Sequence, residues 1–121
     1  MARIAIDIDG VLATTLVRGQ YPQDYPKKQA IPYALEALKI LREKGHILDL
    51  FTARYEEDRA ITEKWLVEKG FSGLYDKLIM GKPRYDVLFD DRAIRFEGDW
   101  LNTLYKFSEL EQKGVYHNDG N

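Results

Sequence analysis

The sequence contains no cysteine among its 121 residues. Disulfide bonds, thiolate nucleophiles, and zinc or iron–sulfur sites held by cysteine are therefore excluded. Histidine is also scarce, because His46 and His117 are its two copies. Any nucleophilic or acid–base chemistry must therefore rest mainly on carboxylates, hydroxyls and amines.

The sequence also lacks an excess of either charge and any long apolar run. It has 18 Lys and Arg against 20 Asp and Glu, a net charge of -2 and a pI near 5.7. Because nucleic-acid binders normally carry a basic patch, nucleic acid is not favoured as a partner. No apolar run approaches the roughly 18 residues of a membrane span, and the strand-like start leaves no room for a signal peptide. We expect no membrane partner and a cytoplasmic location.

Length and composition predict one domain. With 45% hydrophobic and 31% charged residues, the chain resembles ordinary globular domains. A domain of this size buries roughly two thirds of its unfolded surface, which leaves no chain for a separate substrate domain. We expect a single domain over residues 1–113 and a disordered polar tail over residues 114–121.

The apolar residues alternate between a strand period and a helix period. Short apolar runs predict strands at 4–8, 46–51, 77–80, 86–89 and 93–96. Amphipathic patterns predict helices at 31–44, 56–69 and 100–112, the last capped by Asp99. Strands separated by helices imply right-handed crossovers, so we expect a three-layer, Rossmann-like α/β fold with a parallel sheet of about five strands.

Residues 13–30 show neither the strand nor the helix periodicity of apolar residues. Long irregular segments in compact domains are usually functional loops or disordered. This segment directly follows the first predicted strand, so we expect it to overhang the carboxyl edge of the sheet as a flap. Its basic residues and tyrosines, including Arg18, Lys27 and Lys28, are expected to be solvated or packed and to make no specific contacts.

Polar side chains follow four of the predicted strands. Ligands of an open parallel sheet bind beyond the carboxyl ends of its strands. The residues expected there are Asp7, Asp9, Thr52, Lys82, Asp90 and Asp91. Carboxylates gathered at one edge repel one another unless a cation neutralises them, and an all-oxygen ligand set suits Mg²⁺. Mg²⁺ with Lys82 would hold a phosphoryl group, and a carboxylate is the available covalent nucleophile.

These residues resemble the four motifs of the haloacid dehalogenase (HAD) superfamily, over roughly residues 4–96. The motif residues are Asp7-Ile8-Asp9-Gly10-Val11-Leu12, Leu50-Phe51-Thr52, Lys82 and Asp90-Asp91. The resemblance implies that Asp7 is the nucleophile and Asp9 the general acid and base. It implies that Thr52 and Lys82 hold the phosphoryl group. It also implies a Mg²⁺ site made by Asp7, Asp9, Asp90 and Asp91.

A second resemblance concerns the substrate. The segments Gly45-His46, Thr52-Ala53-Arg54 and Gly81-Lys82-Pro83 look like those of small capless HAD proteins found with capsular-polysaccharide genes, which implies a phosphorylated sugar. The predicted phosphate or substrate contacts are Gly10, Thr52, Ala53, Arg54 and Lys82. For Arg54 two roles remain open, because it could pair with Glu56 or Glu57 or reach a substrate anion.

The sequence thus predicts a Mg²⁺-dependent phosphomonoesterase that works through an aspartyl-phosphate on a small phosphorylated substrate. One alternative is a nucleotide or polynucleotide end phosphatase, since a capless site admits large substrates. Another is a receiver-like phospho-signalling module, although the Asp two residues after the nucleophile counts against it. With no cap, the open edge must be closed by the 13–30 segment, a partner subunit or the substrate, so we expect a homo-oligomer.

Overall fold

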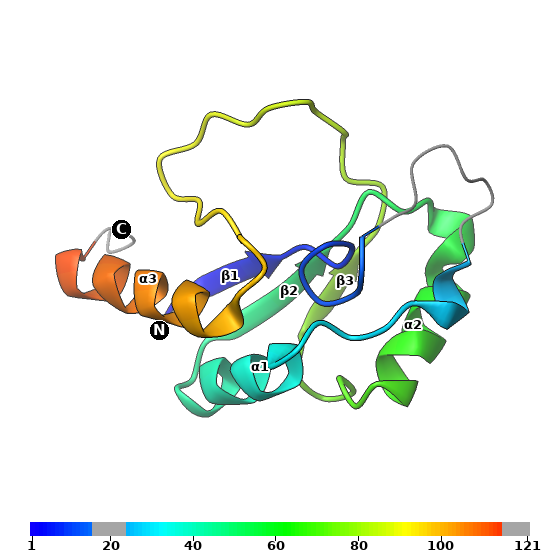
Figure 1. The fold of residues 1–121 in the computed structure, drawn as a ribbon, viewed down its shortest axis with the longest axis horizontal. Helices are drawn as coiled ribbons and strands as arrows, with labels where there is room; N and C mark the ends of the chain where they lie inside the picture. The colour runs from blue at the N-terminus through cyan, green and yellow to red at the C-terminus, as the bar shows by residue number, and fades with distance from the viewer. Residues whose placement is uncertain (16–23, 115–121) are drawn as a thin grey trace.

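The computed structural model describes residues 1–15 and 24–114, and within them it shows a parallel sheet flanked by helices (Figure 1). The strands are β1 (Arg3–Ile6), β2 (Ile47–Phe51) and β3 (Lys77–Ile79), in the order β1-β2-β3. Arg3 lies opposite Ile47, and Asp49 lies opposite Lys77. Parallel pairing brings the carboxyl ends of all three strands to one edge, as the alternating pattern predicts.

One helix follows each of the three strands along the chain. The crossover helices α1 (Ala34–Glu43) and α2 (Arg59–Glu68) each lead to the next strand, and α3 (Trp100–Lys113) ends the described chain. Short 3₁₀ turns, η1 (Tyr25–Lys27) and η2 (Glu56–Asp58), precede α1 and α2. Helix α1 packs against α3, and α2 packs against η1 (Figure 1). The three helices expected from the sequence are therefore all present.

The ends of α3 show why local sequence was sufficient to place it. The Asp99 side chain accepts hydrogen bonds from the backbone N–H groups of Leu101 (2.9 Å) and Asn102 (3.3 Å). These bonds satisfy donors that the first helical turn leaves open. At the other end Gly114 adopts a left-handed φ of 67°, which glycine reaches without strain.

The hydrophobic core lies between the sheet and the helices. Its most buried members from the strands and helices include Leu38, Leu48, Leu50, Trp65 and Leu66. One face of the sheet carries the buried Ile6, Leu48, Leu50 and Leu78. The other face carries charged residues, and there Arg3 pairs with Asp49 at 2.9 Å. None of the helices within residues 1–15 and 24–114 is both long and apolar enough to cross a membrane.

The expected strands at 86–89 and 93–96 do not form. Residues 82–99 contain no helix or strand and arch away from the sheet between β3 and α3 (Figure 1). Val87, Leu88 and Phe89 are 69%, 67% and 94% exposed. A segment with strand propensity forms a strand only when it pairs with a neighbouring strand, and residues 86–89 pair with none in the described structure. The described sheet therefore has three strands where about five were expected, and β1 lies at its edge.

Candidate functional site

A tight turn follows β1 and fixes the first pair of carboxylates. The backbone N–H groups of Leu12 and Ala13 both donate to the carbonyl of Ile8, at 2.8 and 2.9 Å. Gly10 has a φ of 87°, a left-handed value that a side chain would strain. The turn therefore holds Asp7 and Asp9 at the carboxyl end of β1, where the sequence predicts them.

Asp7 and Lys82 form an ion pair at this edge. Lys82 Nζ lies 3.3 Å from Asp7 Oδ2, and the two side chains are 29% and 39% exposed. The other oxygen of Asp7 accepts a hydrogen bond from the Ile8 N–H (2.8 Å). An oriented and accessible carboxylate beside an ammonium group is suited to attack a phosphoryl group whose charge the ammonium partly neutralises.

The backbone places Lys82 beside the end of β2. The Lys82 N–H donates to the carbonyl of Thr52 (2.9 Å), and the Gly81 N–H donates to the carbonyl of Arg54 (2.8 Å). Thr52 is buried, and its Oγ1 accepts a hydrogen bond from the Arg54 N–H (3.2 Å). This leaves the Thr52 hydroxyl proton available for donation. The three expected segments at 7–10, 52–54 and 81–82 thus meet at one edge.

Arg54 takes a role that neither sequence alternative included. Its Nη2 and Nε donate to the two carboxylate oxygens of Asp9, at 2.7 and 2.9 Å. The Arg54 side chain is 0% exposed and that of Asp9 is 10% exposed. Glu56 pairs with Arg59, whose hydrogen bond lowers the pKa of the Glu56 carboxyl. The guanidinium is thus fully enclosed, is paired with Asp9, and has no surface open to solvent in the described structure.

Tyr25 was missed as a neighbour of the site. Its ring lies over the Arg54 guanidinium, with Cζ 3.9 Å from the ring centroid. Burial raises the pKa of Tyr25, and the nearby Arg54 charge partly opposes that rise. The clue in the sequence was an aromatic residue within the irregular segment that follows the nucleophile, but composition alone did not identify its partner.

The described part of the 13–30 segment is packed against the domain. Lys28 is buried, and its Nζ donates to the carbonyls of Thr14 (3.2 Å) and Thr15 (2.7 Å). The Trp65 indole N–H donates to the Lys28 carbonyl (2.8 Å). Lys28 is packed, as expected, but its ammonium group also makes specific hydrogen bonds, which were not expected. Arg18 and residues 115–121 lie outside the described residues.

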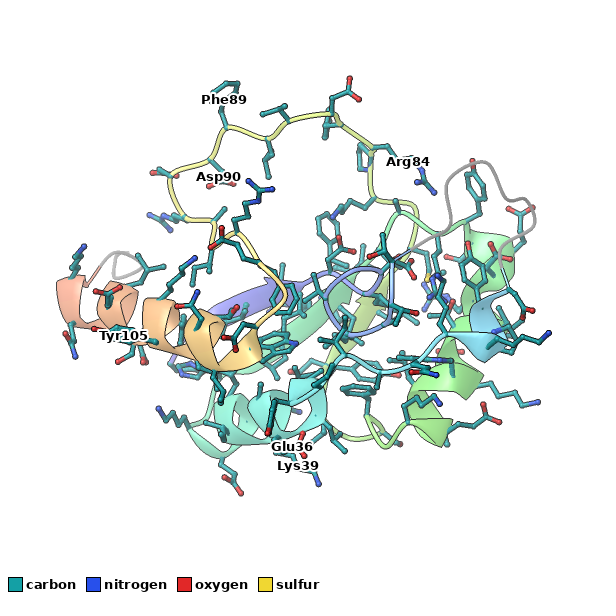
Figure 2. The ribbon with its side chains drawn as sticks, in the orientation of Figure 1. Glu36, Lys39, Arg84, Phe89, Asp90 and Tyr105 are labelled. Carbon is teal, nitrogen blue, oxygen red and sulfur yellow. The ribbon has the colours of Figure 1, made fainter. Side chains whose placement is uncertain are left out.

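The structure does not bring Asp90 and Asp91 to this edge. Both are exposed on the 82–99 loop, and Asp90 Oδ1 accepts a hydrogen bond from the Arg92 N–H (2.7 Å). Figure 2 shows Asp90 and Phe89 on the arch of that loop. Within the described residues no three histidine, aspartate or glutamate side chains are grouped so as to hold a metal ion. The Mg²⁺ ligand set expected from the sequence is therefore not assembled in this arrangement.

His46 lies away from this chemistry, at the amino end of β2. Its Nδ1 accepts a hydrogen bond from the Ala2 N–H (2.9 Å), and its Nε2 lies 3.5 Å from Glu111 Oε2. Burial lowers the pKa of the imidazole, and the Glu111 carboxylate partly opposes this. His46 therefore joins the first strand to α3 and is not placed to act at the carboxyl edge.

Comparison with curated proteins gives one informative relative, and no family model matches the chain. A Bacillus cereus protein named "Putative nucleotidase" is 40% identical over 102 residues, covering 73% of this chain and 54% of that protein. The chain therefore spans about half the length of this relative. A phosphate-ester hydrolase is compatible with the Asp7 and Lys82 pair at the edge of the sheet.

Solved structures support the α/β class of the fold. A crystal structure of a Vibrio cholerae protein superposes with a TM-score of 0.68 at 22% identity, covering 93% of this chain and 98% of the other. A chain of the Pnkp1/Rnl/Hen1 complex superposes with a TM-score of 0.56 at 24% identity, covering 70% of this chain and 30% of the other. At these identities the likeness concerns the α/β fold alone.

Proposed function

We propose that this protein is a phosphomonoesterase of the HAD type that uses Asp7 as its nucleophile. The observation that carries the proposal is the accessible Asp7 carboxylate, held at the end of β1 with Lys82 Nζ 3.3 Å away. The nucleotidase name of the Bacillus cereus relative supports the same reaction class.

The proposed reaction has two steps. An Asp7 oxygen attacks phosphorus, a bond forms between them, and the bond from phosphorus to the leaving oxygen breaks. Asp9 must enter this step protonated on one oxygen, and it gives that proton to the leaving oxygen, so the alcohol leaves neutral. Asp9 then accepts a proton from water as the water oxygen attacks phosphorus, which releases inorganic phosphate and restores Asp7. Lys82 and the Thr52 hydroxyl stabilise the charge on the phosphoryl oxygens.

The substrate class has two candidates. The sequence resemblance favours a phosphorylated sugar, whereas the name of the relative favours a nucleoside monophosphate. Asp7 and Lys82 are 39% and 29% exposed in the described structure, so either leaving group could approach them. We also propose that the protein forms a homo-oligomer and is located in the cytoplasm.

A substrate panel tests this function. We expect inorganic phosphate to be released from nucleoside monophosphates, sugar phosphates or both, with kcat/KM compared across the panel. Phosphorylated DNA ends test the end-phosphatase alternative, and we expect them to react more slowly because the chain is acidic. A long-lived phosphoprotein formed from acetyl phosphate without phosphate release would instead support the receiver-like alternative.

A Mg²⁺ site requires a different position of the 82–99 loop. We infer that residues 86–89 pair in parallel with the open edge of β1, which would add a fourth strand and allow a fifth at 93–96. Two observations support this. The described sheet ends at β1, and the apolar Val87, Leu88 and Phe89 are exposed to water at a cost that strand pairing would remove. Asp90 would then follow its strand as Asp7 follows β1, and both Asp90 and Asp91 could reach Mg²⁺ with Asp7.

Engineered cysteines test this pairing without interference, because the chain has no cysteine of its own. We expect Ala5→Cys combined with either Val87→Cys or Leu88→Cys to form a disulfide under mild oxidation, as neighbouring strands bring such residues within bonding reach. The disulfide is detected by mass spectrometry of peptides. Tyr105→Cys with Val87→Cys is the matched control, since Tyr105 is exposed on α3. Equal cross-linking in the control and both test pairs would contradict the pairing.

A further inference from the structure

We propose that Arg54 is a positioning residue that holds the Asp9 carboxylate in its orientation for proton transfer. The inference rests on the proposed function, because it assigns a partner to the acid of that reaction. It goes beyond that function in giving Arg54 no contact with substrate. It also gives Tyr25, in the described part of the 13–30 segment, a role in covering the pair.

The two-point contact between Arg54 and Asp9 restricts how the carboxylate can turn. Two guanidinium N–H groups donate to the two oxygens of Asp9, at 2.7 and 2.9 Å. A planar fork of this kind fixes both the position and the plane of the carboxylate, which a single lysine charge cannot do. Each carboxylate oxygen has a second lone pair. One oxygen of Asp9 can therefore carry or accept a proton while the fork is in place.

The guanidinium is enclosed on its other sides. Its Nη1 donates to Thr62 Oγ1 (3.0 Å) on α2, and the Tyr25 ring covers its face at 3.9 Å. Thr62 is 0% exposed. Burying a cation is costly unless it is paired and hydrogen-bonded, and here the Asp9 carboxyl group accepts two of its hydrogen bonds. The low exposure also strengthens the attraction within the pair, since water screens it little.

A purely structural role for the side chain is the competing explanation, and the backbone hydrogen bonds limit how much of the local fold depends on the side chain. The Arg54 N–H is bonded to Thr52 Oγ1, and the Arg54 carbonyl is bonded to the Gly81 N–H. These bonds hold the turn after β2 without help from the guanidinium. The side chain can therefore be altered while the path of the backbone around Lys82 is preserved.

A second two-point pair provides a matched control. Arg42 on α1 donates through both Nη atoms to the carboxylate of Asp76, which also accepts the Leu48 N–H (2.9 Å). This pair joins α1 to the residue that precedes β3, at the opposite edge of the sheet from Asp9. Arg42→Lys therefore removes a guanidinium fork of the same kind from a place where no chemistry is proposed.

The experiment compares two substrates that differ in their need for an acid. An alkyl phosphate releases an alkoxide that must be protonated, whereas a nitrophenyl phosphate releases a stable anion. We expect Arg54→Lys to lower kcat on the alkyl phosphate by about 100-fold, the lower range for loss of a general acid, and kcat on the nitrophenyl phosphate by much less. Adding Arg54→Lys to Asp9→Asn should lower kcat on the alkyl phosphate little further.

The outcomes separate this inference from the function on which it rests. Arg42→Lys should leave the ratio of the two kcat values as it is in the unmodified protein. If Arg54→Lys lowers both rates equally, the positioning role is wrong while the phosphatase assignment stands. If the unmodified protein hydrolyses neither substrate, the proposed function fails and this inference with it. Should Arg54→Lys not fold, Tyr25→Leu, which uncovers the guanidinium, must shift the same ratio in the same direction.

Discussion

Replacing Asp7 with asparagine is expected to lower kcat by at least about 10³-fold, because loss of a covalent nucleophile removes the main reaction path. The asparagine side chain has nearly the same size, and its oxygen can still accept the Ile8 N–H, as Asp7 Oδ1 does. An amide has no negative charge with which to attack phosphorus. Asp7 is also 39% exposed, so the core does not depend on it.

The measurement is phosphate release at saturating substrate, together with the thermal unfolding midpoint of each variant. We expect Asp7→Asn to have no acid-stable phosphoenzyme while its unfolding midpoint changes by only a few degrees. Glu97→Gln is the control, because this exposed carboxylate also pairs with a lysine, Lys106, at 2.7 Å. Unchanged activity in Asp7→Asn would rule out the proposed nucleophile.

The elements that sequence predicted correctly are those whose signals are local. Helix α3 begins at the Asp99 cap and ends beside Gly114, and both signals lie within the helix and its ends. Strands β1, β2 and β3 are short apolar runs set apart by helices, which favours parallel pairing. Residues 86–89 show the same kind of run. They form no strand here, because pairing depends on a neighbour that is distant in the chain.

The candidate site shows the same difference between features set by local sequence and features set by long-range contacts. Asp7, Thr52 and Lys82 were predicted to meet because each directly follows a strand, and the structure places them at one edge. The partner of Arg54 was not predicted. A long side chain can reach several acceptors, and the sequence offered Glu56 and Glu57 nearby, whereas Asp9 is 45 residues away. In the folded chain the guanidinium lies against Asp9 and under the Tyr25 ring, and these contacts join segments that are far apart in the sequence.

Replacing Lys82 with alanine is expected to lower kcat by about 10²-fold to 10³-fold, the usual cost of losing one group that stabilises transition-state charge. The ammonium lies 3.3 Å from Asp7 Oδ2, so a phosphoryl group bound to Asp7 would lie within its reach. Arginine should restore part of the rate, because it keeps the charge but changes its shape and reach.

The backbone makes this prediction specific to the ammonium group. The hydrogen bonds from the N–H groups of Gly81 and Lys82 to the carbonyls of Arg54 and Thr52 do not involve the lysine side chain. They persist in Lys82→Ala, so the turn should stay in place and the unfolding midpoint should change little. Lys106→Ala removes a surface ammonium paired to Glu97 and should retain full kcat. Equal losses of kcat in the two variants would show that general surface charge, and not the position of Lys82, governs the rate.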